Sequence, residues 1–345
     1  MTPPLIYDLN FDELKKMLVA AGESNFRARQ IWDGLYKNHW QSPDDFTNLS
    51  KSLRGKLIEL AKFDAITPAL KLTSADRRTR KTLFLLQDGL SIEAVLMRYD
   101  RRQTLCISTQ AGCAMGCAFC ATGQMGFNRH LTSGEIVAQV LYYARLLSQE
   151  SLQVTNVVVM GMGEPFHNYV NTLSAIDRLN DPEGYNFGAR RFTISTSGLV
   201  PAIRRFADEK RQVNLAVSLH AVDDELRSSM MPVNKKYNVE ELLDACRYYI
   251  DKTGRRLTFE WALINGINDT PDQARKLSQK IKGMLCHVNA IPLNPTNGYA
   301  GKATTHERAV IFKGILDQAG IPCTVRIRRG IDIQAGCGQL AVDVK

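Results

Sequence analysis

The sequence lacks any segment near the ~18 consecutive apolar residues that a membrane-spanning helix requires. Its first residues, MTPPLIYDLNFDELKK, have neither the basic start nor the apolar core of a secretion signal. It also contains no internal repeat and no low-complexity segment. These absences argue against membrane, secreted and fibrous proteins, and we expect a cytoplasmic protein.

Nothing in the composition suggests that the chain needs a covalent scaffold to fold. Hydrophobic residues make up 44% and charged residues 23% of its 345 residues, as in ordinary globular proteins. A chain of this length buries roughly 75% of its unfolded surface without help from disulfides or metals. Because cytoplasmic thiols stay reduced, the eight cysteines are not expected to form a disulfide framework. Cysteines that cluster therefore call for a chemical explanation.

Positive charge is in excess, and it is concentrated in pairs. The chain has 44 Lys and Arg against 35 Asp and Glu, a net charge of +9. The pattern is typical of a protein with a polyanionic partner, although a solvated basic surface is an equal alternative. The basic groups are Arg77-Arg78-Thr79-Arg80-Lys81, Arg101-Arg102, Arg190-Arg191, Arg204-Arg205, Lys235-Lys236, Arg255-Arg256 and the segment 326–329.

Three parts follow one another along the chain. Residues 1–63 show apolar residues at helical spacing, with Ser50 as a helix cap, and predict a small all-helical domain. Residues 64–103 carry two short apolar runs around Asp88-Gly89, which predict a β-hairpin extension. From residue 104 to 345, strand-like runs alternate with amphipathic helices.

This alternation predicts an α/β fold with a parallel sheet and right-handed crossovers. Six βα units and a closing strand are too few for an eight-fold barrel, so we expect an open, partial (βα)6 barrel of the TIM type. The expected strands are 104–109, 154–161, 191–197, 213–220, 256–264, 287–294 and 322–328. The expected helices are 133–149, 170–180, 200–209, 239–252, 271–282 and 306–319, the first with a capping box from Thr132 to Glu135.

The chemistry-bearing residues follow the expected strands, where the active sites of such barrels lie. Cys113, Cys117 and Cys120 come after the first strand in a loop rich in Gly and Ala. Three thiolates can hold a cubane iron–sulfur cluster and leave one iron open, whereas structural zinc sites have four ligands. The alternative is a zinc site with His130 as the fourth ligand.

The spacing of the three cysteines resembles that of the radical S-adenosylmethionine (SAM) superfamily, and GMGEP (161–165) is similar to its Gly-Glu strand end. The likeness narrows through LCISTQAGCAMGCAFCATG, GMGEPFHN, ISTSGLVP, SLHA, MMPVNKKY, PLNP and the segment 329–340, RGIDIQAGCGQL. With these motifs the chain is identified as a member of the RlmN/Cfr family of RNA adenine methyltransferases, from end to end. Gly336 stands where many members have Ala, and we expect it to be tolerated.

The resemblance implies roles for three catalytic residues. Cys337 accepts a methyl group from one SAM, and a radical made from a second SAM activates that methyl for addition to adenine. Cys106 then releases the product, which leaves a Cys106–Cys337 disulfide to be reduced in each cycle. Glu93 accepts the proton. From the residues alone, a buried strand cysteine is the favoured interpretation of Cys106, and a solvent-facing strand residue is an equal alternative for Glu93.

The resemblance also assigns the cofactors and their contacts. A [4Fe-4S] cluster with an open iron sits on Cys113, Cys117 and Cys120, and two SAM molecules are consumed per methylation. The contacts to SAM are Gly163, Glu164, Ser195, Ser218, Leu219, His220 and Asn294, for which turn and capping roles are the alternative. Cys246, Cys286 and Cys323 match no motif and are expected to be packing residues.

The function implied is methylation at C2 of an adenine in 23S rRNA, near the peptidyl-transferase centre, and of the adenine 3′ of the anticodon in tRNAs. Pro165 and Ser197 favour this C2 branch over Cfr-type C8 methylation. A non-enzymatic, metal-stabilised RNA-binding protein is the alternative from another class. Other expected properties are a flavodoxin- or ferredoxin-like electron donor, no membrane partner and a monomeric state.

Overall fold

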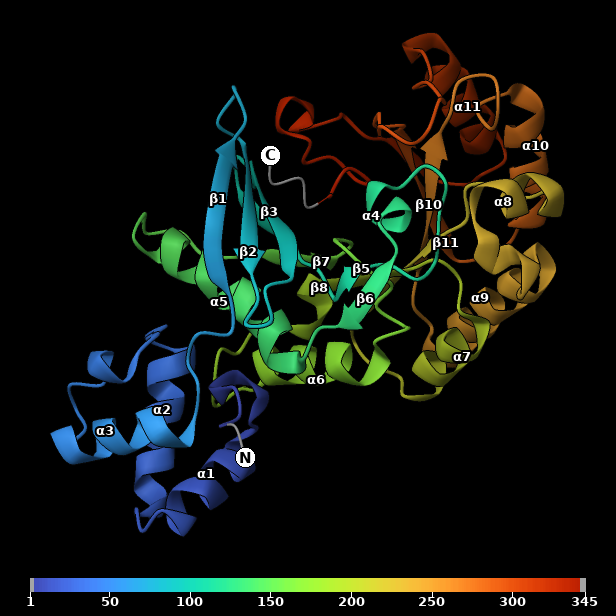
Figure 1. Cartoon of the computed structure of the whole chain (residues 1–345). Helices are drawn as coiled ribbons and strands as arrows, with labels where there is room; N and C mark the ends of the chain where they lie inside the picture. The colour runs from blue at the N-terminus through green and yellow to red at the C-terminus, as the bar shows by residue number, and fades with distance from the viewer. Residues whose placement is uncertain (1–2, 342–345) are drawn as a thin grey trace.

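The computed structural model describes residues 3–341 and begins with a bundle of three helices. A 3-10 helix at Ile6–Asp8 precedes α1 (Phe11–Ala20), α2 (Asn25–Tyr36) and α3 (Lys51–Leu60). Ser50 caps α3 as predicted, because its side chain accepts a hydrogen bond from the Leu53 amide. Figure 1 shows this bundle, in blue, beneath the sheet and beside α5.

An antiparallel extension connects the bundle to the main sheet. It consists of β1 (Thr67–Thr73), β2 (Thr79–Leu85) and β3 (Ser91–Tyr99), and β3 pairs antiparallel with β4 (Arg102–Cys106). The predicted hairpin around Gly89 joins β2 to β3, and Gly89 has the positive φ of 81° that such a turn favours. The extension therefore continues the barrel sheet rather than forming a separate unit.

Seven parallel strands form the barrel, and the predicted α/β architecture is confirmed. The sheet order is β1-β2-β3-β4-β7-β8-β9-β10-β11-β12, and within residues 3–341 no ladder joins its two ends. The barrel is therefore open. The strands after β4 are β7 (Asn156–Val159), β8 (Phe192–Thr196), β9 (Asn214–Ser218), β10 (Leu257–Leu263), β11 (Cys286–Pro292) and β12 (Cys323–Val325).

Helices cover the outside of this sheet, and all six predicted ones are present. They are α5 (Ser133–Ser148), α6 (Tyr169–Asn180), α7 (Val200–Asp208), α9 (Val239–Thr253), α10 (Pro271–Lys280) and α11 (His306–Gln318). Thr132 and Glu135 form the predicted capping box of α5. None of the helices within residues 3–341 is long and apolar enough to cross a membrane.

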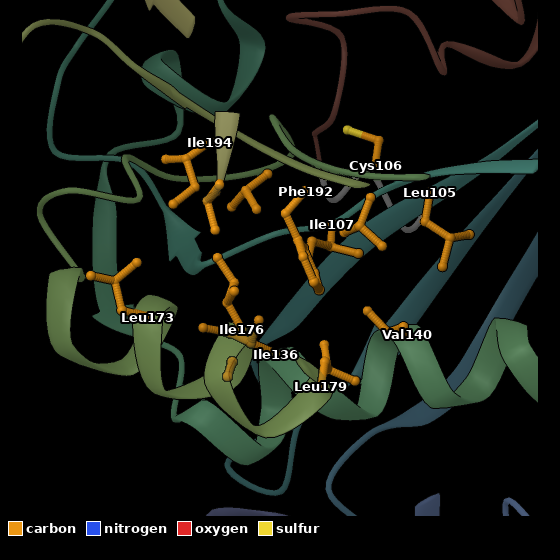
Figure 2. Packing of buried hydrophobic residues seen from close by; sticks show 14 of the residues in the cluster. Leu105, Cys106, Ile107, Ile136, Val140, Leu173, Ile176, Leu179, Phe192 and Ile194 are labelled. Atoms are coloured by element: carbon orange, nitrogen blue, oxygen red, sulfur yellow. The ribbon is translucent and has the colours of Figure 1, made fainter. Parts of the chain in front are cut away.

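Alternating strand residues divide the core from the barrel interior. Leu105 and Ile107 point toward the helices, whereas the Cys106 side chain between them points the opposite way (Figure 2). On the helix side they pack with residues of α5 and α6, such as Val140 and Leu179. This alternation leaves the inner face of the sheet for polar and cysteine side chains.

Several short elements were not expected from the sequence. They are β1, the small hairpin of β5 (Gln110–Gly112) and β6 (Phe127–His130), α4 (Ala121–Gln124), α8 (Asp224–Met230) and a 3-10 helix at Pro232–Lys235. The strand expected at 104–109 ends at Cys106, because residues 110–112 turn away to pair with β6. Apart from β1, which pairs with β2 at the edge of the sheet, these elements lie next to the cysteine loop.

Candidate active site

Loops after the parallel strands meet around a cavity of about 180 Å³, which we call the cysteine cavity. All three cysteines of the predicted cluster loop line it. Six of the seven predicted cofactor contacts line it as well: Gly163, Glu164, Ser195, Ser218, His220 and Asn294. The sequence thus identified residues that the fold gathers from distant segments.

Backbone contacts hold the cysteine loop in place. The Cys113 amide donates to the carbonyl of Gly126 (2.7 Å), and the Ala121 amide donates to the carbonyl of Gly338 (2.7 Å). Gly112 has a φ of 76°, and a Cβ there would lie 2.1 Å from the Gly126 oxygen. Glycine is therefore required for the loop to close against β6.

The three thiols of the cysteine loop interact with one another and are poorly solvated. Burial raises the pKa of Cys113 to about 12 and also raises that of Cys117, so both thiols hold their protons at neutral pH unless a metal binds them. Within residues 3–341, no group of three or more His, Cys, Asp and Glu is arranged to hold a metal ion. His130 does not line the cavity, and its Nδ1 lies 3.0 Å from Gln110 Nε2. The zinc alternative therefore gains no support.

The Gly-Glu turn after β7 packs tightly against the segment that leads to the cysteines. Gly163 has a φ of 102°, and a Cβ there would lie 2.5 Å from the side chain of Gln110. Gln110 accepts a hydrogen bond from the Glu164 amide (2.9 Å). Its Nε2 lies 3.2 Å from Nδ1 of His167, a residue without a role in the sequence analysis. Glycine and Gln110 together fix the direction of this turn.

Glu164 is a buried carboxylate that anchors two strand ends. Its Oε1 accepts from the Phe166 amide (3.0 Å) and its Oε2 from the Ser197 amide (2.6 Å). Burial raises its pKa, while these amide bonds lower it. Each carboxylate oxygen has a second lone pair, so Glu164 retains acceptor capacity on the cavity side.

Two residues that line the cavity carry polar atoms that the described residues leave unsatisfied. Asn294 Nδ2 donates to the carbonyl of Cys337 (3.0 Å), but Asn294 Oδ1 and Ser197 Oγ are buried without a hydrogen-bond partner within residues 3–341. Buried polar atoms of this kind commonly indicate a missing ligand. The prediction for Leu219 is not matched by the cavity, because its side chain lies in the core and its carbonyl accepts from Arg227 Nε (3.0 Å).

A second cavity of about 580 Å³ contains both predicted catalytic thiols, and we call it the arginine cavity. Cys106 at the end of β4 and Cys337 in the C-terminal segment line it together. Cys120, Glu260, Asn294 and Cys337 line both cavities. Both thiols are free, so the implied Cys106–Cys337 disulfide is not present.

Cys337 is accessible within the cavity, whereas Cys106 is only 8% exposed. Desolvation and the charge of Glu260 raise the pKa of Cys337 to about 11. Gly336 precedes it, and a Cβ at Gly336 would lie 2.6 Å from Asn294 Nδ2. Glycine at this position is thus more than tolerated, since it lets the Asn294 amide pack against the loop.

Glu93 lies in a different environment from the two thiols. It is on β3, 3% exposed, and its Oε1 lies 2.9 Å from Nζ of the buried Lys81. Glu93 is not among the residues that line either cavity in the described part of the chain. The alternative of a solvent-facing residue is wrong, because Glu93 is buried.

Two buried ionisable residues at the site were missed by the sequence analysis. Glu260 on β10 lines both cavities, accepts from Asn289 Nδ2 (2.6 Å), and has a pKa raised to about 7 by burial. Arg227 on α8 is fully buried behind Ser197 and Ser218. A carboxylate within the apolar run FEWAL was an available signal for Glu260, whereas Arg227 had none.

Arginines gather where the arginine cavity opens to the surface. Arg102, Arg326, Arg328 and Arg329 line it, and the guanidinium carbons of Arg102 and Arg329 lie 4.4 and 4.6 Å from the centre of the Tyr99 ring. Tyr99 thus connects β3 with the segment that carries Cys337. Two of the basic groups found in the sequence lie at this opening.

Comparison with known protein families gives matches to two segments of the chain. The profile of the radical SAM superfamily matches residues 107–277, and that of the ribosomal RNA large subunit methyltransferase N-terminal domain matches residues 6–63. The chain is 48% identical over 340 residues to the dual-specificity RNA methyltransferase RlmN 1 of Myxococcus xanthus. The aligned region covers 99% of this chain and 95% of that protein.

Other relatives agree over nearly the same length. A probable dual-specificity RNA methyltransferase RlmN of Geobacillus kaustophilus is 47% identical, covering 98% of this chain and 93% of its own. The crystal structure of a radical SAM methyltransferase from Sphaerobacter thermophilus superposes with a TM-score of 0.97 at 50% identity, covering 99% of this chain and 100% of that one.

Proposed function

This chain belongs to the RlmN family of radical SAM RNA methyltransferases, and we propose that it methylates C2 of one adenine in 23S rRNA and of the adenine 3′ of the anticodon in tRNAs. The methyl group would pass through Cys337. The observation that carries this proposal is that two free thiols, Cys106 and Cys337, line the arginine cavity, and that Cys337 also lines the cysteine cavity.

The residues present fit the cofactors that the family implies, a [4Fe-4S] cluster and SAM. Cys113, Cys117 and Cys120 would hold the cluster, Glu164 would accept from the amino group of SAM, and the buried Asn294 Oδ1 would gain the partner it lacks within residues 3–341. Ser195, Ser218 and His220 would contact the ribose and adenine. When bound, the cluster and SAM supply a methyl group and an organic radical.

The two thiols would then divide the work at the base. Cys337 would accept the methyl group; removal of one hydrogen atom by the radical would let the remaining methylene bond to adenine, so that enzyme and RNA become covalently joined. After loss of the C2 proton and of one electron to the cluster, Cys106 would attack the Cys337 sulfur and break its bond to the methylene carbon, which takes up a proton to become the methyl group. This leaves a disulfide that an external reductant must reduce. The raised pKa of Cys337, about 11, means that its proton has to be removed before methyl transfer.

Glu93 is the proposed acceptor of the C2 proton, by the family resemblance. Glu93 on β3 is buried beside Lys81 of β2. Either the base or the Lys81–Glu93 pair must therefore move when RNA binds. Glu260, which already lines both cavities, is the other carboxylate available to the reaction.

The RNA would approach through the opening of the arginine cavity. Arg102, Arg326 and Arg328 there are accessible to solvent and can pair with phosphates, while the adenine has to leave its stack to reach Cys337. The electrons would come from a donor of the flavodoxin or ferredoxin type. C8 methylation is the second candidate, and Pro165 and Ser197 favour C2 over it.

Removing each thiol separately tests this division of work. Cys106→Ala should trap protein cross-linked to RNA, because Cys337 still adds to the base but nothing releases it. Cys337→Ala should still cleave SAM reductively yet leave the RNA unmodified. Gel shift under denaturing conditions and mass spectrometry of nucleosides from treated 23S rRNA would show both results and locate the methyl group.

Cys286→Ala is the matched control, because Cys286 is a buried cysteine outside both cavities. This variant should methylate RNA without a trapped adduct. Free, fully methylated RNA made by Cys106→Ala at the normal rate would contradict the role of Cys106. A methyl group at C8 would replace the C2 proposal.

A further inference from the structure

Arg227 is a fully buried cation at the centre of the molecule. Its side chain donates to the carbonyls of Leu219 (3.0 Å), Ser197 (2.7 Å) and Ser218 (3.1 Å) and to Asn234 Oδ1 (2.9 Å). All of these acceptors are neutral. Gly198 makes room for it, because a Cβ there would lie 3.2 Å from one guanidinium nitrogen.

A buried charge normally has a charged partner, since desolvation without compensation is costly. No Asp or Glu in the described residues forms a direct ion pair with Arg227; the Asp224 carboxylate acts on it only from a distance, and Asn234 Nδ2 donates to Asp224 Oδ1 (2.9 Å). Burial lowers the pKa of Arg227 only to about 10, so the group stays charged at neutral pH. The protein therefore keeps a buried positive charge whose hydrogen-bond acceptors are all neutral.

This charge lies behind the wall of the cysteine cavity, because the Ser197 and Ser218 carbonyls that accept from Arg227 belong to residues that line the cavity together with Cys117, and the end of α8 contacts the cysteine loop. The Ala118 amide donates to the carbonyl of Met230 at the end of α8 (2.9 Å), and a Cβ at Gly116 would lie 3.8 Å from Pro232. In its ionised form, as it would be when holding the cluster, Cys117 favours the charged form of Arg227 more than Cys246 and Asp224 do. Arg227 in turn lowers the pKa of Cys117 against the larger effect of burial.

We propose that the positive charge of Arg227 stabilises the reduced form of the iron–sulfur cluster that Cys113, Cys117 and Cys120 would hold. Three thiolates give the cluster region negative charge, and reduction by one electron from a low-potential donor adds one more. A fixed cation beside Cys117 in a poorly solvated site favours that uptake. The inference rests on the proposed function, because it requires the cluster.

The test is the reduction potential of the reconstituted full-length protein. Arg227→Gln removes the charge but retains a hydrogen-bonding side chain, and it should lower the equilibrium constant for reduction at least tenfold, about 59 mV for one electron. The readout is an anaerobic titration with dithionite and redox mediators, followed by electron paramagnetic resonance. Cys246→Ala, which removes the other nearby sulfur, should leave the potential unchanged.

A second variant neutralises Arg227 without removing it. The exchange Asp224→Asn with Asn234→Asp moves one carboxylate onto Arg227 while the net charge of the chain stays constant. In this exchange Ser228 Oγ can donate to the carboxylate introduced at position 234, but the bonds that Asn234 Nδ2 makes to the Asp224 carbonyl (3.1 Å) and to Asp224 Oδ1 (2.9 Å) are lost, because Asp224 Oδ1 also accepts from the Val239 amide. This double variant should lower the potential in the same direction, and it keeps the test valid if Arg227→Gln does not fold.

The two possible failures are distinguishable by the iron and sulfide content. If the reconstituted wild-type protein contains no iron and no acid-labile sulfide, the proposed function itself is overturned. Variants that hold the full cluster at the wild-type potential would overturn the role of Arg227 and leave the proposed function standing. A shift in Cys246→Ala as large as that in Arg227→Gln would assign the effect to packing rather than charge.

Discussion

At the scale of single residues, the site is governed by charges that burial leaves poorly solvated. Glu260 and Cys337 line the same two cavities, and the charge of Glu260 contributes to the high pKa of the Cys337 thiol. Because thiolates are the reactive form of cysteine, the charge of Glu260 adds to desolvation in lowering the reactivity of Cys337.

Glu260→Gln should therefore make Cys337 more reactive. Above pH 8 the Glu260 carboxyl, with its pKa near 7, is ionised, and removing its charge lowers the pKa of Cys337 from about 11. The rate of Cys337 alkylation by iodoacetamide at fixed pH should rise roughly threefold or more, since each pKa unit changes the thiolate fraction tenfold. Peptide mapping by mass spectrometry measures it.

Glu93→Gln is the matched control, because Glu93 is paired with Lys81 and lines neither cavity within residues 3–341. An equal acceleration in both variants would show that general loosening, and not the charge of Glu260, controls the thiol.

At the scale of elements, the segment after β12 carries both Cys337 and three of the arginines that line the arginine cavity. The Ala75 amide donates to Asp332 (2.8 Å), and Arg329 stacks on Tyr99, so the β1–β2 turn and β3 both hold this segment. Residues 326–329 are thereby fixed at the opening of the arginine cavity rather than in a free tail.

Arg328→Gln should weaken RNA binding in a salt-dependent way. If the exposed guanidinium pairs with one phosphate, the slope of log affinity against log salt should fall by about 0.7–0.9. Filter binding of a 23S rRNA fragment between about 50 and about 200 mM salt measures this slope. Lys280→Gln, whose lysine pairs with Glu240 outside both cavities, should keep the wild-type slope. An unchanged slope in Arg328→Gln would place the RNA elsewhere.

The predictability of elements followed their local signals. Helices such as α5 and α9 begin with capping boxes and carry apolar stripes, so their bounds were predicted to within about two residues. β1 was missed because nearly all its residues are exposed, which removes the alternation that indicates a strand. α8 was missed because its seven residues, DELRSSM, are too few and too polar for a periodic signal.

The site was predictable where a motif carried it. The three cysteines, the Gly-Glu turn and Asn294 follow strands in sequence, so the barrel topology alone brings them together. Arg227, Glu260 and the pairing of Glu93 with Lys81 depend on which segments meet in the folded chain, and local patterns do not contain that information.

At the scale of the whole molecule, the helical bundle and the barrel share one hydrophobic core. Asp8 accepts from the Gly134 amide (2.6 Å) and from Ser133 Oγ (3.1 Å) at the start of α5, and Arg178 of α6 donates to the carbonyls of Tyr7 and Asp8. The division into residues 1–63, 64–103 and 104–345 remains a prediction, because these contacts cross the first boundary.

Asp8→Ala should loosen the bundle from the barrel. Loss of this cap on α5 should lower the free energy of unfolding by about 1 kcal/mol. It should also increase hydrogen exchange of backbone amides in residues 6–63, measured by mass spectrometry. Glu59→Ala, on the exposed face of α3, is the control and should change neither. Unaltered exchange in Asp8→Ala would show that the shared core alone attaches the bundle.

The position of Cys337 behind the last strand has a consequence for incomplete chains. A protein that ends early through a premature stop codon or C-terminal proteolysis retains Cys113, Cys117 and Cys120 but loses Cys337, the proposed methyl acceptor. Such a fragment would keep the residues proposed to hold the cluster and lack the thiol proposed to receive the methyl group. Truncation behind the last strand would thus separate SAM cleavage from methylation of RNA.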